Sequence, residues 1–262
     1  MHIYLRMDYK KNLKKGQTRI CDFDEDQILI RDKNLVQDLV GKYSFTQAWL
    51  LQALGKDPSE QQLTIVDAVL VTIMEHGLVP SAIATRLTIH GAPESFQGAI
   101  AAGLLGVGDR YAGTASECGA IFERICNSED MHVEAKTIIK EYRSSKKPVP
   151  GFGHPIHKSQ DLRVNRLLEI CQEAGVDGRF IEAMHIVESS LSEELGKKIV
   201  TNVSAAIGAA LAEASIPSNM MRGVVLTARC AGLVGHLMEE LNSPAASALW
   251  EGAQNNIDYH GQ

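Results

Sequence analysis

The sequence predicts an all-α fold, and three observations indicate it. Helix-capping residues recur in front of apolar runs with helical spacing. Two long segments are dominated by Ala, Gly and Leu, which suits closely packed helices. Strand-like runs do not alternate with helices as a parallel sheet requires. With 262 residues, 45% of them hydrophobic, the chain can form one large domain or two smaller ones.

The N-terminal part holds the one predicted departure from helix. Residues 1–20 are a polar lead-in, and residues 19–30 suit a two-stranded ribbon that turns at residues 22–26. Residues 44–47 read Ser-Phe-Thr-Gln, a capping box that begins a helix. Gly55 is expected to end that helix, because glycine adopts the left-handed conformation of a helix C-cap.

A second capping signal follows directly. We expect Asp57 to be the N-cap of the next helix and Pro58 to occupy its first position. The helix is expected to end at residues 75–77, which read Glu-His-Gly. Its apolar residues recur at helical spacing, at Leu63, Val66, Leu70 and Ile73.

The rest of the chain is predicted to be helical. The small-residue segments are residues 96–107 and 199–214, the second opening near Asn202, and residues 108–113 break the pattern between helices. The predicted helices span residues 80–86, 96–107, 115–125, 132–144, 162–174, 179–195, 199–214 and 220–241.

Composition excludes several classes of function. A formal charge of −6 and the absence of a long basic block argue against a nucleic-acid partner. The N terminus lacks an apolar leader and no segment suits a membrane span, so we expect no membrane partner and a cytoplasmic location. Five widely spaced cysteines without metal-ligand spacing favour a reduced protein with no metal cofactor.

One stretch, residues 148–163, combines an irregular backbone with a titratable side chain and two cations. Its prolines and glycines impose an irregular backbone that a ligand can approach closely. A titratable imidazole, His154, follows at once, and the cations Lys158 and Arg163 come next. This combination suits an anionic ligand whose reacting oxygen exchanges a proton. The alternative is a helix-capping loop that carries a surface histidine.

Several segments together resemble the citrate synthase superfamily, and more closely its citryl-CoA lyase-like branch, which includes the C-terminal module of ATP-citrate lyase. Their order and separations match the family over about residues 20–250. The segments are residues 75–81 (EHGLVPS), 103–113 (GLLGVGDRYAG), 151–154 (GFGH), 161–163 (DLR) and 229–236.

The resemblance implies an architecture and an assembly. It implies a large helical domain, made of residues 1–114 and 221–262, and a smaller inserted helical domain, residues 115–220. It also implies a homodimer or higher homo-oligomer. The small apolar helix around residues 98–103 suits close packing across a symmetric interface.

The resemblance further implies site residues. His76 and His154 are the expected catalytic histidines. Arg163 and Arg229 are expected to bind substrate carboxylates, for which guanidinium groups are suited. Coenzyme A, the one expected cofactor, is expected to contact the adenine-binding loop and a cation for its phosphate. These cofactor-binding residues are Pro150, Gly151, Phe152, Gly153 and Lys158.

The sequence departs from the family at Ser204. Relatives have an Asp in an Asn-Val-Asp segment, where it moves the α-carbon proton, whereas residues 202–204 here read Asn-Val-Ser. A serine hydroxyl cannot act as a carboxylate base near neutral pH without an activating partner. We still place Ser204 in the catalytic site.

Two functions remain open. The first is a carbon–carbon lyase or synthase that cleaves citryl-CoA, or a related 3-hydroxyacyl-CoA, into an acyl-CoA and a 2-oxo acid or another carbonyl compound. The alternative is a catalytically impaired protein of the same fold that binds CoA thioesters. In both cases the partners are a small CoA thioester and a carboxylic or oxo acid.

Overall fold

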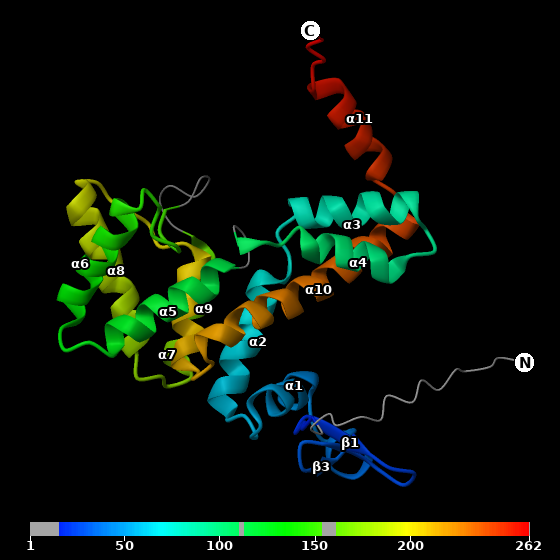
Figure 1. The fold of residues 1–262 in the computed structure, drawn as a ribbon, viewed down its shortest axis with the longest axis horizontal. Coiled ribbons are helices and arrows are strands. Elements are labelled where there is room, and N and C mark those ends of the chain that lie inside the picture. Colours follow the sequence, from blue (N-terminus) through cyan, green and yellow to red (C-terminus); the bar gives the residue numbers. More distant parts are fainter. Residues whose placement is uncertain (1–15, 110–112, 154–160, 262) are drawn as a thin grey trace, which may run out of the picture. The chain divides into compact units, whose positions relative to one another are not determined.

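A computed structural model describes residues 16–109, 113–153 and 161–261 (Figure 1). Helices dominate the described residues, so the predicted all-α fold is confirmed. The chain groups into two compact units, Met1–Pro58 and Ser59–Gln262. The expected division into residues 1–114 with 221–262 and residues 115–220 remains a prediction.

The first unit contains a small antiparallel sheet and two short helices. Strand β1, Cys21–Phe23, pairs with β2, Ile28–Ile30, which confirms the predicted ribbon. A third strand, β3 at Lys33–Asn34, extends the sheet and was not predicted. A π-helical turn, η1 at Leu35–Leu39, and helix α1, Phe45–Leu54, follow.

Helix α1 has the ends that the sequence predicted. The Ser44 hydroxyl accepts a hydrogen bond from the amide of Gln47, and the Gln47 side chain accepts one from the amide of Ser44. Gly55 ends the helix with φ +76°. Both local signals therefore act as expected.

Helix α2, Glu60–Met74, begins later than predicted, and the expected N-cap was wrong. The cap is Ser59, which forms a reciprocal capping box with Gln62. Asp57 instead accepts from the Tyr43 hydroxyl at 2.7 Å and pairs with Nζ of Lys33 at 3.0 Å. A capping box satisfies two otherwise unpaired groups at once, so Ser59 is the better cap once Asp57 has these partners.

The remaining helices follow the predicted order with three differences. Helix α3 continues beyond residue 86, residues 199–202 are not helical, and α11 was not predicted. The helices are α3 Pro80–Gly91, α4 Phe96–Leu105, α5 Thr114–Cys126, α6 Met131–Ser144, α7 Leu162–Glu173, α8 Arg179–Leu195, α9 Val203–Glu213, α10 Ser218–Asn242 and α11 Ala246–Asn256.

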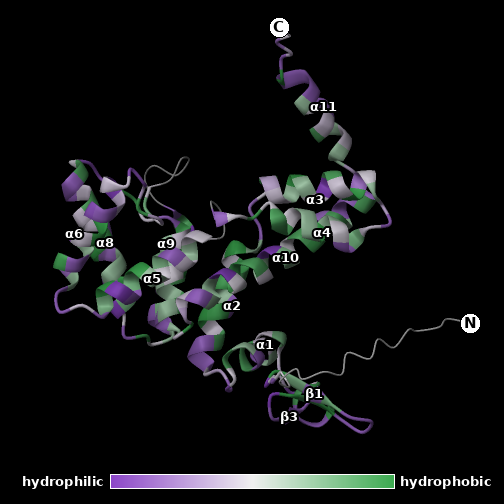
Figure 2. Ribbon diagram, viewed as in Figure 1, coloured by the Kyte–Doolittle hydropathy of each residue, from purple (hydrophilic) through white to green (hydrophobic). Residues whose placement is uncertain are grey.

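Helix α9 lies at the centre of one part of the second unit. It contacts α5, α7 and α8, and it also touches α2 and α10. Residues 205–212 of α9 are all buried, which explains its small, apolar sequence. Helices α5 and α6, by contrast, carry both hydrophobic and hydrophilic residues (Figure 2), as expected for helices with one buried face.

Helices α3, α4 and α10 pack against one another in the same unit, and α10 also contacts α2 and α5. A Cβ atom at Gly103 of α4 would lie 2.0 Å from Oγ1 of Thr85 and 2.7 Å from Cδ1 of Leu233. Gly103 therefore allows the close packing within the chain that the small residues of this segment predict.

No helix in the described part of the chain has the length and apolarity needed to cross a membrane.

Candidate functional site

The loop at residues 150–153 is joined to the start of α9. The amide of Asn202 donates to the Gly151 carbonyl at 2.9 Å, and Nδ2 of Asn202 donates to the Gly153 carbonyl at 3.0 Å. The amide of Gly153 donates to the Val200 carbonyl at 2.7 Å. The structure therefore brings two segments together that lie about 50 residues apart in the sequence.

Gly151 is required by this packing. Its φ is +86°, a backbone conformation that residues other than glycine rarely adopt. A Cβ atom here would lie 2.5 Å from Sγ of Cys118 and 2.7 Å from Cβ of Ala205. Only glycine lets the loop pack this closely against α5 and α9, so the irregular loop inferred from the sequence has a structural cause.

Ser204 is half-buried in the first turn of α9. Asn202 is the N-cap, and its side chain accepts from the Ser204 amide at 2.9 Å. Ser204 thus sits at the positive end of the helix dipole, where an anion is stabilised. Position 204 therefore suits a negatively charged side chain, but the residue there is a serine with a neutral hydroxyl.

Arg163 has a local partner. Asp161, the buried N-cap of α7, accepts from Nε of Arg163 at 3.0 Å and from its Nη2 at 2.8 Å. The predicted role of Arg163 in carboxylate binding remains a prediction. A substrate carboxylate would have to use the outer edge of the guanidinium or replace Asp161.

His76 lies in the exposed segment after α2, and Glu75 holds its backbone. Oε1 of Glu75 accepts from the amide of His76 at 2.8 Å and from the amide of Gly77 at 2.6 Å. Partial burial acts to raise the pKa of Glu75, but His236 and the two amides outweigh it and hold that pKa below its usual value. Glu75 is therefore a carboxylate under ordinary conditions.

Arg229 is a buried cation on α10 and is 8% exposed. Its Nη1 has no hydrogen-bond partner among the described residues. Burial lowers the pKa of Arg229, and the charge of Glu75 opposes this effect only in part. A buried guanidinium nitrogen without a partner is costly, so the site is suited to an anionic ligand.

A cavity of about 520 Å³ is lined in part by Val200 and Thr201, the residues that pair with the loop at Gly151–Gly153. It lies between α7 and α8, and Asp161, Lys198 and Thr201 are among the residues that line it. Lys198 is a cation that the sequence analysis did not select. Two predicted site residues, His154 and Lys158, lie outside the described residues.

The described residues contain no group of three or more His, Cys, Asp or Glu side chains arranged to hold a metal ion. They form two groups of candidate site residues instead. One joins residues 150–153 to residues 200–204, and the other joins Glu75 and His76 to α10.

Comparison with known proteins identifies the family. Residues 48–249 match the family described as citrate synthase, C-terminal domain. The chain belongs to the citrate synthase family. Within this family it is similar to the citryl-CoA lyase of Hydrogenobacter thermophilus, with 31% identity, a TM-score of 0.85, and coverage of 95% of this chain and 96% of the other.

Other members of the family are more distant. The ATP citrate lyase of Methanothrix soehngenii, solved with citrate and coenzyme A, matches 96% of this chain and 42% of its own, with 19% identity and a TM-score of 0.76, and supports the fold alone. "Putative citrate synthase 2" of Mycobacterium bovis is 23% identical over 78% of this chain. The chain spans about half the length, 54%, of this curated relative.

The resemblance to the citrate synthase family and its citryl-CoA lyase-like branch is therefore confirmed. The roles of individual residues remain predictions. The sequence predicts no site role for Glu75 or Arg86, and His236 suits a structural role. The only sequence signal for a link is the spacing of Arg229, Gly232 and His236, which places all three on one face of α10.

Proposed function

We propose that this protein is an acyl-CoA-dependent carbon–carbon lyase or synthase of the citryl-CoA lyase type. The observation that carries the proposal is the near-full-length similarity to a citryl-CoA lyase, which extends over 95% of this chain. The buried cation Arg229, with an unpaired nitrogen close to the His76 segment, supports a substrate that carries a carboxylate. Such a substrate agrees with the expected 3-hydroxyacyl-CoA.

The proposed cleavage needs three groups. A base removes the hydroxyl proton of the 3-hydroxyacyl-CoA, and we assign this role to His154. The carbon–carbon bond then breaks: the hydroxyl oxygen becomes a carbonyl, and the bonding electrons pass to the thioester as an enolate. A donor must stabilise the enolate oxygen, and we assign this role to His76.

The last step returns a proton to the enolate carbon. A carboxylic acid at position 204 would supply it, but the chain has a serine there. The hydroxyl of Ser204 has a pKa far too high for this work unaided. We therefore expect slow cleavage of citryl-CoA unless another acid or a water molecule delivers the proton.

We propose that coenzyme A binds at Pro150–Gly153, with Lys158 near a phosphate. The carbonyl groups of Gly151 and Gly153 are already occupied by Asn202, which holds the loop in shape. The backbone of Pro150 and Phe152 is then the part that remains to bind the adenine. Arg163 and Arg229 are proposed to hold carboxylates on the rest of the substrate.

A second function is favoured by Ser204 itself. A protein that binds CoA thioesters without turnover would keep the anion-binding residues and lose the group that moves the carbon-bound proton. Arg229 is present in a buried position, while the acid at position 204 is missing. This pattern is what such a binding protein would have.

Two measurements separate the alternatives. Calorimetry with coenzyme A tests binding, and a panel of 3-hydroxyacyl-CoAs and of acyl-CoA plus 2-oxo acid pairs tests turnover. Binding with turnover of any panel member supports the enzyme, and binding alone supports the second function. Absence of coenzyme A binding would contradict both. Lys158→Glu reverses a charge beside the expected phosphate and should clearly lower the affinity, and an unchanged affinity would mean that coenzyme A binds elsewhere.

We also propose that the protein is a homodimer. Gln97, Ala101 and Leu105 form an exposed stripe on α4, and Leu105 is 85% exposed, while the opposite side of α4 packs within the chain. Light scattering at micromolar concentration should give twice the chain mass of 28.6 kDa. Leu105→Glu should shift the protein toward monomer, and a wild-type monomer would contradict the proposal.

A further inference from the structure

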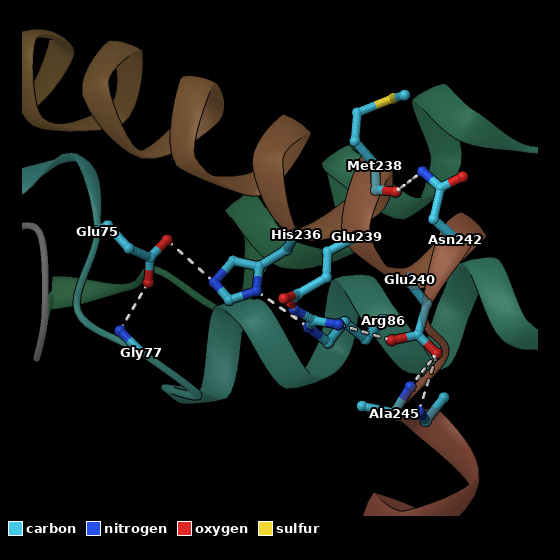
Figure 3. Close-up of polar contacts among 10 residues, drawn as sticks. Glu75, Gly77, Arg86, His236, Met238, Glu239, Glu240, Asn242 and Ala245 are labelled. Atoms are coloured by element: carbon cyan, nitrogen blue, oxygen red, sulfur yellow. Dashed lines mark hydrogen bonds and ion pairs between the residues drawn. The ribbon is translucent and has the colours of Figure 1, made fainter.

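A network of polar side chains connects the end of α2 to α10. Nε of Arg86, on α3, donates to Nδ1 of His236, on α10, at 3.0 Å. Nε2 of His236 lies 3.0 Å from Oε2 of Glu75. Figure 3 shows His236 between the other two side chains. The side chains of Arg86 and His236 are only 3% and 10% exposed, so the contact between them is shielded from water, whereas Glu75 is 41% exposed.

The donor and acceptor roles within this network are defined. An arginine can only donate hydrogen bonds, so Nδ1 of His236 must be the acceptor and the ring proton lies on Nε2. Nε2, which carries the proton, lies 3.0 Å from Oε2 of Glu75, within ion-pair distance but without the alignment of a hydrogen bond. Glu240, which is 3% exposed, accepts from Arg86 at 2.8 Å and holds it in place, whereas Glu239 contacts Arg86 from an exposed position. The imidazole is therefore fixed in one tautomer and one orientation.

Glu75 connects His236 to the backbone that carries His76. Its Oε2 faces His236, while its Oε1 accepts from the amides of His76 and Gly77. Hydrogen bonds to an ionised acceptor are stronger than neutral ones. The two oxygens of one carboxylate thus connect α10 directly to the backbone of the His76 segment.

Helix α10 also meets this segment through Gly232, one turn before His236. A Cβ atom at Gly232 would lie 2.1 Å from the carbonyl oxygen of Met74 and 3.2 Å from Oε2 of Glu75. The backbone at the end of α2 therefore rests against α10. Arg229, Gly232 and His236 share the face that does this.

We propose that His236 is a positioning residue for His76. It holds the Glu75 carboxylate, which holds the backbone from which the His76 imidazole projects. This inference rests on the proposed catalytic role of His76. It adds a buried support, reaching from α3 through α10, that sets where that imidazole can lie.

The first test measures backbone protection and needs no turnover. Hydrogen exchange of the His76 and Gly77 amides should accelerate at least about tenfold in His236→Phe, because their acceptor loses its anchor. Glu75→Ala removes the acceptor itself from a partly exposed position and should do the same if His236→Phe fails to fold. Glu239→Gln is the matched control: Glu239 contacts Arg86 from a position that is 64% exposed, and both amides should keep wild-type exchange.

The second test separates positioning from binding. On a substrate that the protein turns over, with Ser204→Asp as background if needed, His236→Phe should lower kcat by about 10²-fold. KM should stay unchanged. His236→Gln should restore part of kcat, because its amide nitrogen is a hydrogen-bond donor that can reach toward Glu75, whereas phenylalanine has none.

Opposite results overturn the proposal. Unchanged amide exchange in both His236→Phe and Glu75→Ala would show that Glu75 does not hold the segment. Faster exchange with an unchanged kcat would show that the segment needs no such support. If no variant turns over any substrate, the proposed function fails, and the exchange rates alone decide whether His236 orders the segment.

Discussion

Ser204→Asp is expected to raise the exchange of acetyl-CoA methyl protons with solvent by about 10²–10⁴-fold, the range of a general acid or base step. A carboxylate at this position can take and return a carbon-bound proton, whereas the serine hydroxyl cannot do so unaided. Loss of the methyl proton signal in D₂O, followed by NMR, measures the exchange. Cleavage of citryl-CoA should rise with it.

The substitution should not harm the fold. Position 204 lies in the first turn of α9, where the helix dipole favours a negative charge by about 0.3–1 kcal/mol. Ser204→Asn is the matched control, because asparagine has the shape of aspartate but no basic carboxylate. Efficient citryl-CoA cleavage by the wild type, or a folded Ser204→Asp that binds CoA and gains nothing, would contradict the assigned role.

Arg229→Met is expected to change stability and function in opposite directions. The free energy of unfolding should rise by about 1–3 kcal/mol, because a buried charged nitrogen without a hydrogen-bond partner is removed. Methionine is long and unbranched enough to fill the vacated space. Urea unfolding measures the first effect.

The same variant should lose its hold on the substrate. Removing one member of a buried charge pair typically costs about 2–5 kcal/mol, so kcat/KM should fall by roughly 30-fold to several thousand-fold. Coenzyme A affinity, which we assign to residues 150–158, should be retained. The expected outcome is a more stable protein that binds CoA and does not process its substrate.

Arg222→Met serves as the control on the same helix. Arg222 is partly exposed and pairs with Asp109, so its replacement should change stability by no more than about 0.5 kcal/mol. A clear loss of stability in Arg229→Met would show that the Arg229 guanidinium serves the fold. The assignment of Arg229 to the substrate would then be wrong.

Local sequence signals predicted most of the helices correctly, and they failed where two candidates competed. The capping box at Ser44 acts as expected because its two partners lie three residues apart. At the start of α2 two possible caps, Asp57 and Ser59, lie two residues apart. Lys33 and Tyr43 engage Asp57, and this choice depends on contacts outside the local sequence.

Helix α11 was missed for a related reason. It has no capping side chain at its first residues. Its first amides, at Ala245 and Ala246, donate to Oε1 of Glu240 at 2.9 and 2.8 Å. Glu240 is in turn held by Arg86, which lies 154 residues earlier in the sequence. Glu240 precedes these amides by five and six residues, farther than the usual capping patterns, and its position depends on a distant helix.

By itself the sequence determined the helical class, the irregular loop at Gly151–Gly153 and the family of the chain. The resemblance to that family in turn singled out His76, Arg229 and Ser204. These features depend on neighbouring residues or on the order of short segments. Only the tertiary structure decided which partner each polar side chain has. Arg163 pairs with Asp161 two residues away, Arg229 is buried with an unpaired nitrogen, and His236 joins Arg86 to Glu75. Burial and long-range hydrogen bonding set the energy of a charged group, and both arise only when segments far apart in the sequence pack together.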